Sequence, residues 1–463
     1  MNTEKIFDAI DRDWEVHLDR YRRYMRQPSV SGTGEGVRDM AALLIEEFKD
    51  LGCQETLLVE TPGWPVAYGS LDVGAEKTML LYGMYDVQPV VGEDWRVPPF
   101  SGDITEEPGI GEVMMSRGIC NQKGPFASLM NALWAIKEQE GTLPVNVKFV
   151  IEGEEEMASE HLPGAIEVLR SRLEGCDFCY FPHFSQDRDG GVKQYLGTKG
   201  VMFIELTCKG GDWGAPVGGS IHGSNAIWMD NPVWTLVHVL KTLKDENEKV
   251  LIEGFYDDVA GPLDGDEAIV DELVKSFDPE AYLRNNDVRR YKLGLEGKDL
   301  LRRYFYSPEL NIDGIAGGYC GEGTKTLLPN EAVVRLDIRT VPNLEPQKLI
   351  ELFKRHLTKL GVDDRIEARY ISAYNWSRSK IDEPAVQALI AAEREMGYPV
   401  EPWVTLAGSA PFSLFQSMLG LPIAFGGLGH GGRVHSPNEY ATVKGLKDME
   451  KCIVLFLRNI SAG

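Results

Sequence analysis

The sequence predicts an α/β protein of two domains, in which an αβα domain built on a mostly parallel sheet is interrupted by an inserted α+β domain. The chain has 463 residues, which is more than one compact core usually organises. Helical and strand patterns alternate in the first part of the chain, as in βαβ units. From about Tyr195 the pattern changes to a glycine-rich stretch with longer alternating strands and long helices. This change predicts a separate domain within the first.

The hydrophobic periodicity locates the main elements of the predicted αβα domain. We expect helices at Val37–Leu51 and Ala127–Lys137, and strands at Thr78–Tyr82, Val145–Ile151 and Phe178–Phe181. Ligands bind at the carboxyl ends of the strands in such open sheets, so the residues after the apolar runs are the candidates for a site.

The inserted domain shows a strand, helix, strand, helix pattern. We expect strands at 201–208 and at Ala332–Ile338, helices at Trp234–Leu243 and Pro346–Leu360, and a final amphipathic helix at Val443–Ile460, which returns to the first domain. The predicted domains are therefore residues 1–197 with 399–463, and residues 198–398.

Composition and charge exclude several classes of function. Hydrophobic residues make up 43% of the chain and charged residues 26%, as in ordinary globular proteins. The net charge of −23 argues against nucleic acid or an anionic membrane as a partner, because phosphate recognition needs clustered Lys and Arg.

The first residues are charged throughout, and no stretch of about 18 apolar residues follows. The seven cysteines are an odd number and are scattered, which fits reduced thiols. A cytoplasmic location is therefore expected. For the single C-x-x-C at Cys176 and Cys179, core packing is favoured over redox or metal duty, because it lies in an apolar run.

Three predicted strand ends are unusually polar: Tyr85-Asp86, the run Glu152–Glu156, and Pro182-His183. Clustered carboxylates repel one another, so a buried run of this kind requires a cation or a raised pKa. The alternative is a solvated acidic turn. His435 lies in a glycine-bordered loop, where either a ligand or an ordinary surface histidine can occur.

These residues lie within segments that resemble the M20 metallopeptidase family, which includes carnosinase-type dipeptidases, glutamate carboxypeptidase and aminoacylases. The segments occur in family order along nearly the whole chain and read TMLLYGMYDVQPV, SRGICNQKGP, IEGEEEMAS, NIDGIAGGYCGEGTKTLLPNEAVVRLDIRTVPN, LAGSAPF and VHSPNE. The resemblance implies a zinc-peptidase-like αβα catalytic domain with an inserted lid and dimerisation domain.

The resemblance also implies roles for single residues. Members of the family hold two metal ions bridged by an Asp, and a Glu acts as general base on water. Asp86 matches the acid that orients the first histidine ligand, Glu155 matches the general base, and Glu156 and His435 match ligands of one metal ion.

This chain departs from the family at the metal site. Met84 replaces the first histidine ligand, Asn121 replaces the bridging Asp, and His183 stands where the family has a carboxylate ligand. A thioether is a poor ligand for zinc or manganese, and an amide brings no charge to offset two cations. We therefore expect one divalent ion (Zn, Mn or Fe) per protomer, held by Glu156, His183 and His435 with Asn121 adding a neutral oxygen. The alternatives are the relic of a dead site, or metal-free catalysis by Glu155 and Asp86.

Matches on the substrate side are more complete. His222 resembles the lid histidine that, in the family, reaches across a dimer interface to the oxyanion formed in the neighbouring subunit's active site. The resemblance therefore implies a homodimer, in which His222 is both a catalytic and a substrate-binding residue. Arg339 matches the arginine that binds the substrate carboxylate. Thr326 and Ser409 match residues that contact the substrate.

The sequence thus predicts a metal-dependent hydrolase of the peptidase and amidohydrolase type, acting on a C–N bond of a small carboxylate-bearing molecule. Candidate substrates are an amide, a dipeptide-like molecule or an amine-bearing aromatic acid. The rival prediction is a catalytically silent protein that binds such a molecule.

Overall fold

The computed structural model describes residues 1–285 and 287–462, and the chain divides into two compact units. Unit 1 comprises 1–197, 378–405 and the segment from Pro411 onward, and unit 2 comprises 198–377 and 406–410. The strands β9 (Gly197–Thr198) and β16 (Ser377–Arg378) each contain a point at which the chain passes between units. No helix in the described ranges is long and apolar enough to cross a membrane.

Unit 1 is built on a six-stranded sheet. Its strands, in spatial order, are β1 (Glu55–Val59), β2 (Val66–Leu71), β6 (Asn146–Glu152), β3 (Thr78–Met84), β7 (Phe178–Pro182) and β18 (Ile423–Gly426). The pairings β6–β3, β3–β7 and β7–β18 are parallel, and the two pairings at the β1 edge are antiparallel. The parallel strands end at the same edge of the sheet, which is where the polar strand ends predicted from the sequence lie.

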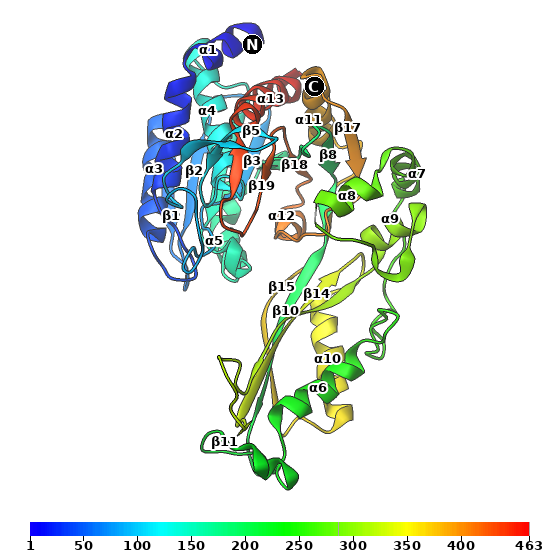
Figure 1. Cartoon of the computed structure of the whole chain (residues 1–463). Coiled ribbons are helices and arrows are strands. Elements are labelled where there is room, and N and C mark those ends of the chain that lie inside the picture. The colour runs from blue at the N-terminus through cyan, green and yellow to red at the C-terminus, as the bar shows by residue number, and fades with distance from the viewer. Residues whose placement is uncertain (286, 463) are drawn as a thin grey trace. The chain divides into compact units, whose positions relative to one another are not determined.

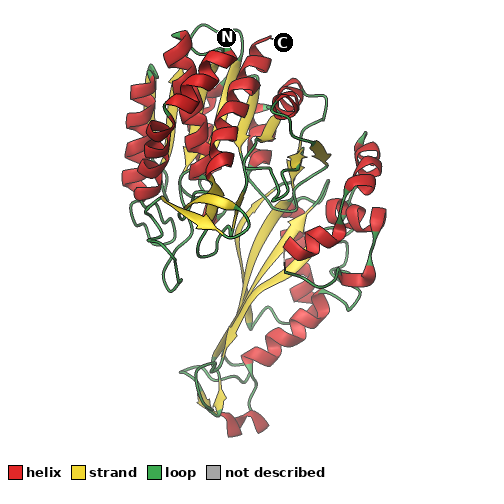
Figure 2. Ribbon diagram, turned by 45° about the horizontal axis from the view of Figure 1, so that its top comes forward, coloured by secondary structure: helices red, strands yellow, loops and turns green. Residues whose placement is uncertain are grey.

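The helices of unit 1 pack either on its sheets or on one another (Figures 1 and 2). They are α1 (Thr3–Arg12), α2 (Trp14–Arg26), α3 (Val37–Leu51), α4 (Lys123–Glu140), η1 (Glu155–Met157), α5 (Leu162–Leu173), α11 (Pro384–Glu395), α12 (Phe412–Leu419) and α13 (Val443–Ala462). Leu81 and Phe149 face the main core together with α3, α4 and α13. Tyr82 points to the opposite face, because side chains alternate along a strand, and it packs on Phe412 and Phe415 of α12.

Smaller strands of unit 1 complete two further sheets. β19 (Gly431–Gly432), β20 (Tyr440–Thr442), β5 (Gly111–Met115) and β4 (Asp103–Glu107) form an antiparallel sheet, and β17 (Val400–Trp403) pairs with β8 (Val192–Tyr195). The first of these sheets joins the segment before Ser116 to the segment after Glu439, two parts of the chain that are distant in sequence.

Unit 2 is an antiparallel four-stranded sheet with helices on one face. The strand order is β12 (Glu309–Gly317), β14 (Glu331–Thr340), β10 (Gly200–Lys209) and β15 (Ile366–Tyr374). Met202, Ile204 and Leu206 alternate along β10 and are buried against α6 (Pro232–Leu243) and α10 (Pro346–Leu360). The remaining elements are β11 (Ile221–His222), η2 (Gly223–Ile227), α7 (Asp266–Ser276), α8 (Pro279–Asn285), η3 (Lys292–Gly294), α9 (Gly297–Tyr306) and β13 (Leu327–Leu328).

The predicted elements are present within a few residues of their expected ends, and α3 and α10 have the predicted bounds. The second domain boundary differs from the prediction. Residues 378–398, expected in the inserted domain, belong to unit 1, because Leu389 and Ala392 of α11 are buried in the core that contains α13. Residues 406–410, expected in the first domain, belong to unit 2.

Candidate active site

Two strand ends meet in unit 1 and bring Asp86 to the backbone of the Glu155–Glu156 turn. β3 and β6 are parallel, and Met84 lies in register with Glu152. The carboxylate of Asp86 accepts hydrogen bonds from the backbone N–H groups of Glu155 and Glu156, both at 3.1 Å. Asp86 is fully buried, and this burial, with the nearby charge of Glu156, raises its pKa to about 7. Asp86 therefore holds the acidic turn in place.

Glu155 lies among other carboxyl groups at this strand end. Burial raises the pKa of its carboxyl well above the usual value, and the charges of Glu156, Asp86 and Glu152 add to the rise. A carboxylate in such surroundings binds a proton more strongly than one in water.

Glu156, His435 and Asn121 form a compact polar group. The carboxylate of Glu156 lies 3.0 Å from Nε2 of His435 and accepts a hydrogen bond of 2.9 Å from the side-chain amide of Asn121. The Asn121 amide nitrogen is 3.1 Å from the same imidazole nitrogen. The hydrogen bond that His435 donates to the carboxylate of Glu156 raises the pKa of His435. Gln88 completes the group by donating to the other oxygen of Glu156 at 2.8 Å.

The other two carboxylates of the acidic run bind elsewhere. Glu152 accepts hydrogen bonds from Tyr82 at 2.6 Å and Ser159 at 3.0 Å, and burial raises its pKa to about 8. Glu154 forms an ion pair with His161 at 2.9 Å. Glu152 and Glu154 therefore have partners other than Asn121 and His435.

Met84 occupies a position that offers no metal ligand. Its side chain is buried, and its backbone N–H donates to Oε1 of Gln122 at 3.1 Å. The amide nitrogen of Gln122 donates to the carbonyl of Pro182 at 2.6 Å. Gln122 thus joins the ends of β3 and β7 with neutral hydrogen bonds at the place where the resemblance implied the first metal ion.

His183, the third predicted ligand, contacts an aromatic side chain. Its ring packs on Phe425, with ring centroids 5.1 Å apart, and burial lowers its pKa to about 4. The neutral imidazole has the protonation state of a metal ligand. However, within the described ranges no group of three or more His, Cys, Asp or Glu side chains is arranged to hold a metal ion. The trio of Glu156, His183 and His435 is therefore not assembled.

These donors do not fit a pair of ions, because Met84 and Asn121 bring no charge at two of the expected ligand positions. They fit a single ion better. Glu156 supplies a carboxylate and His435 an imidazole within about 3 Å of each other. The Asn121 amide group offers an oxygen in the same place when it turns over, since its two ends have nearly the same shape.

Unit 2 places Arg339 beside Ser409. The guanidinium donates to the hydroxyl of Ser409 at 2.9 Å and to the carboxylate of Asp337 at 2.8 Å. Arg339 projects from β14 near its carboxyl end, and Ser409 lies in the short segment 406–410 of the same unit. Such a guanidinium, fixed on one side, can bind a carboxylate with its free N–H groups.

His222 and Thr326 are neighbours at the β11–β13 pairing, where His222 lies opposite Leu327. The Nδ1 atom of His222 accepts a hydrogen bond from the backbone N–H of Ser224 at 3.2 Å. In a neutral imidazole the other nitrogen then carries the hydrogen, so Nε2 of this exposed side chain is a donor. Thr326 is exposed as well, and its carbonyl accepts a hydrogen bond from Gly223 at 3.3 Å.

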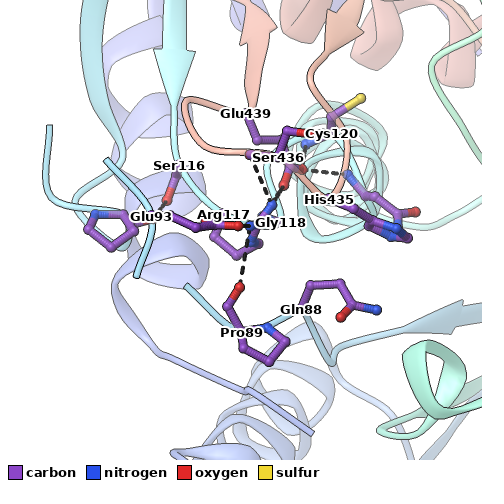
Figure 3. Close-up of polar contacts among 12 residues, drawn as sticks. Gln88, Pro89, Glu93, Ser116, Arg117, Gly118, Cys120, His435, Ser436 and Glu439 are labelled. Atoms are coloured by element: carbon purple, nitrogen blue, oxygen red, sulfur yellow. Dashed lines mark hydrogen bonds and ion pairs between the residues drawn. The ribbon is translucent and has the colours of Figure 1, made fainter. Parts of the chain in front are cut away.

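Four contributing residues escaped the sequence analysis: Gln88, Gln122, Arg117 and Glu439. Gln88 and Gln122 adjoin predicted site residues, but an amide carries no charge that marks it in a sequence. Arg117 and Glu439 are buried in the first unit and form an ion pair at 3.0 Å (Figure 3). Their pairing could not be read from residues that are so far apart in the chain.

The chain is similar to known peptidases. The sequence model of Peptidase family M20/M25/M40 matches residues 80–462. A Cys-Gly metallodipeptidase, DUG1, of Candida albicans is 29% identical over 94% of this chain and 93% of its own length. A Beta-Ala-His dipeptidase of Mus musculus is 28% identical over 77% of this chain and 70% of its own length.

Solved structures give the same result. The M20 family metallo-carboxypeptidase Sso-CP2 of Sulfolobus solfataricus has a TM-score of 0.86 at 31% identity, and the match covers 96% of this chain and 99% of that one. Human carnosine dipeptidase 1 has a TM-score of 0.83 at 24% identity over the full length of both chains, which indicates a shared fold.

Proposed function

The chain belongs to Peptidase family M20/M25/M40, and from that premise we propose that it hydrolyses a C–N bond in a small, carboxylate-bearing molecule with the help of one divalent metal ion. The family and the predicted fold class are confirmed, and the chain is a hydrolase acting on C–N bonds. The contact of Glu156 with His435 and Asn121, next to Glu155 in the chain, is the observation that carries the proposal of a single ion.

Glu156 and His435 would hold the ion, with the oxygen of Asn121. A divalent ion of the Zn, Mn or Fe type lowers the pKa of water and polarises a scissile carbonyl. Glu155 takes the proton from the attacking water and delivers it to the leaving nitrogen. Asp86 fixes the backbone from which Glu155 and Glu156 project.

Arg339, supported by Ser409, binds the carboxylate of the substrate in this proposal. Cys-Gly and β-Ala-His, the substrates named for the relatives, both carry a terminal carboxylate next to the C–N bond that is cleaved. The altered metal site favours a substrate that needs less charge stabilisation than an ordinary peptide, such as an activated amide or an amine-bearing aromatic acid.

A homodimer is part of the proposal, because unit 2 carries an exposed apolar surface. Ile227, Trp228 and Trp234 are 88%, 76% and 59% exposed. β12 is an edge strand, and its Ile312 and Ile315 are exposed too. Large exposed apolar groups beside an unpaired strand edge are typical of surfaces that pair with another chain. His222 would then serve the active site of the partner subunit, and Nε2 would donate to the oxyanion.

The competing proposals are a silent binding protein and a metal-free acid–base enzyme that uses Glu155 and Asp86. Glu156 already has Asn121, Gln88 and His435 as polar partners, which is the observation in favour of both. The cytoplasmic location stays a prediction.

The test begins with metal content per protomer, measured by plasma mass spectrometry on protein purified without chelator, and with a screen of Cys-Gly, β-Ala-His and related amides. Glu155→Gln should abolish turnover and leave metal content unchanged. The matched control is Glu154→Gln, because Glu154 belongs to the same run but pairs with His161. Full activity of Glu155→Gln would refute the role of the base. Absence of both metal and turnover in the unaltered protein would favour the binding protein.

A further inference from the structure

Glu439 is a buried carboxylate whose recorded partners are all hydrogen-bond donors. It is 1% exposed. One oxygen accepts the backbone N–H groups of Cys120 and Asn121, both at 2.9 Å. The other oxygen accepts the N–H of Gly118 at 3.2 Å and a guanidinium N–H of Arg117 at 3.0 Å. A single side chain therefore fixes the backbone that carries Asn121.

Arg117 connects the same carboxylate to the loop of His435. Its side chain is 1% exposed. Nη1 donates to the carbonyl of Ser436 at 3.2 Å, and Nη2 donates to the two carboxylate oxygens of Glu93 at 3.1 and 2.8 Å and to the carbonyl of Pro89 at 3.4 Å. Figure 3 shows Arg117 between Pro89 and the Ser436–Glu439 segment.

The loop of His435 needs such support, because its backbone is locally unfavourable. Arg433, His435 and Asn438 have φ angles of 57°, 60° and 62°, in the left-handed region that non-glycine residues seldom adopt. Conformations of this kind persist where surrounding contacts determine them.

We propose that Glu439 and Arg117 are positioning residues that set the orientation of Asn121 and His435 toward the proposed metal ion. The metal readout of this inference rests on the proposed function. The pair acts on two segments that are distant in sequence, 117–121 and 435–439, and it places the Asn121 amide 3.1 Å from His435 Nε2. Mutation of groups that hold metal ligands in this way commonly lowers metal affinity by about 10- to 100-fold.

Glu439→Gln tests this role directly, because the four partners of the carboxylate are all hydrogen-bond donors. The amide nitrogen of Gln is also a donor, so on one side of the side chain donors would face donors. Glu450→Gln is the matched control. Glu450 is fully buried in the same unit and accepts hydrogen bonds from Tyr21 and Asn131 and contacts His17, but none of these partners lies in the proposed site. The milder Glu93→Gln removes one anchor of Arg117 and covers the case in which Glu439→Gln does not fold.

Two measurements on the full-length protein test the inference. The first is calorimetric titration of the metal-free proteins with Zn²⁺ and with Mn²⁺. The metal affinity of Glu439→Gln should be at least roughly tenfold lower than that of the unaltered protein, and that of Glu93→Gln should fall by less. The affinity of Glu450→Gln should not fall, even if this control has a lower Tm. Hydrogen exchange of the metal-free proteins should be faster in segments 117–121 and 435–439 of Glu439→Gln only.

Unaltered metal affinity in a folded Glu439→Gln, or equal losses in Glu439→Gln and Glu450→Gln, would overturn the inference. If the unaltered protein binds neither ion, the proposed metal fails, and hydrogen exchange alone decides: faster exchange confined to the two segments supports the positioning role, and unchanged exchange overturns it.

Discussion

The side-chain amide of Asn121 donates to Glu156 at 2.9 Å, at the position where relatives of the family are expected to carry a bridging carboxylate. The amide of Asn121 is neutral, so it adds no negative charge that could hold a second cation. Asn121 therefore lacks the charge of the expected Asp, and its side chain binds Glu156.

Restoring both lost ligands should restore a second ion. Met84→His combined with Asn121→Asp provides an imidazole and a bridging carboxylate, so the metal content should rise from about one to about two ions per protomer. Plasma mass spectrometry after loading with Zn²⁺ measures this. Met84→Leu combined with Asn121→Asp is the control and should stay near one. Two ions in the unaltered protein would contradict the assignment of a single ion.

Arg339→Lys should weaken substrate binding more than it slows the chemical step. A lysine has the charge but cannot donate to Ser409 and a substrate carboxylate with a planar fork, so KM should rise roughly tenfold or more with a smaller change in kcat. Arg335→Lys is the control, because Arg335 lies on the same strand but is exposed and pairs with Glu205. Steady-state kinetics decide, and an equal effect of both variants would speak against a substrate role.

Mixed dimers test whether His222 acts in the partner subunit. His222→Ala and Glu155→Gln should each be inactive alone. After unfolding and refolding together, a heterodimer contains one site with an intact Glu155 and the partner's intact histidine, so turnover should return to roughly a quarter of the unaltered level when subunits pair at random. No recovery, with heterodimers verified by native mass spectrometry, would place His222 in its own subunit's site or outside catalysis.

Glu393 predicts a pH dependence of stability. It is fully buried in α11, neither carboxylate oxygen has a hydrogen-bond partner in the described structure, and burial raises its pKa to about 8. The folded state therefore binds a proton that the unfolded state releases above about pH 4.5. The stability associated with that proton is complete below this pH and is lost as the pH rises through about 8.

Glu393→Gln removes this loss, so its Tm relative to the unaltered protein should increase from pH 5 to pH 9. Each kcal/mol corresponds to roughly 2–4 °C for a domain of this size. Glu395→Gln is the control on the same helix, since Glu395 pairs with Arg458 and its pKa is lowered. A Tm difference for Glu393→Gln that does not change with pH would contradict the prediction.

The sequence predicted most of the secondary structure, because the apolar periodicity of segments such as α3, α10 and β14 records which face each element buries. It missed the place of α11. An amphipathic helix could pack on the core of either domain, so its sequence does not assign it to one of them. Its packing on α13 places it in unit 1.

The sequence by itself determined the family, the αβα fold with an inserted domain, and the identity of the residues at each expected site position, including the substitutions Met84 and Asn121. These are properties of single residues and of local patterns. The tertiary structure decided which of those residues meet. It joined Glu156 to His435 and Asn121, gave Glu152 and Glu154 other partners, and revealed the ion pair of Arg117 and Glu439. Such contacts depend on strand order and burial, which a local sequence pattern does not record.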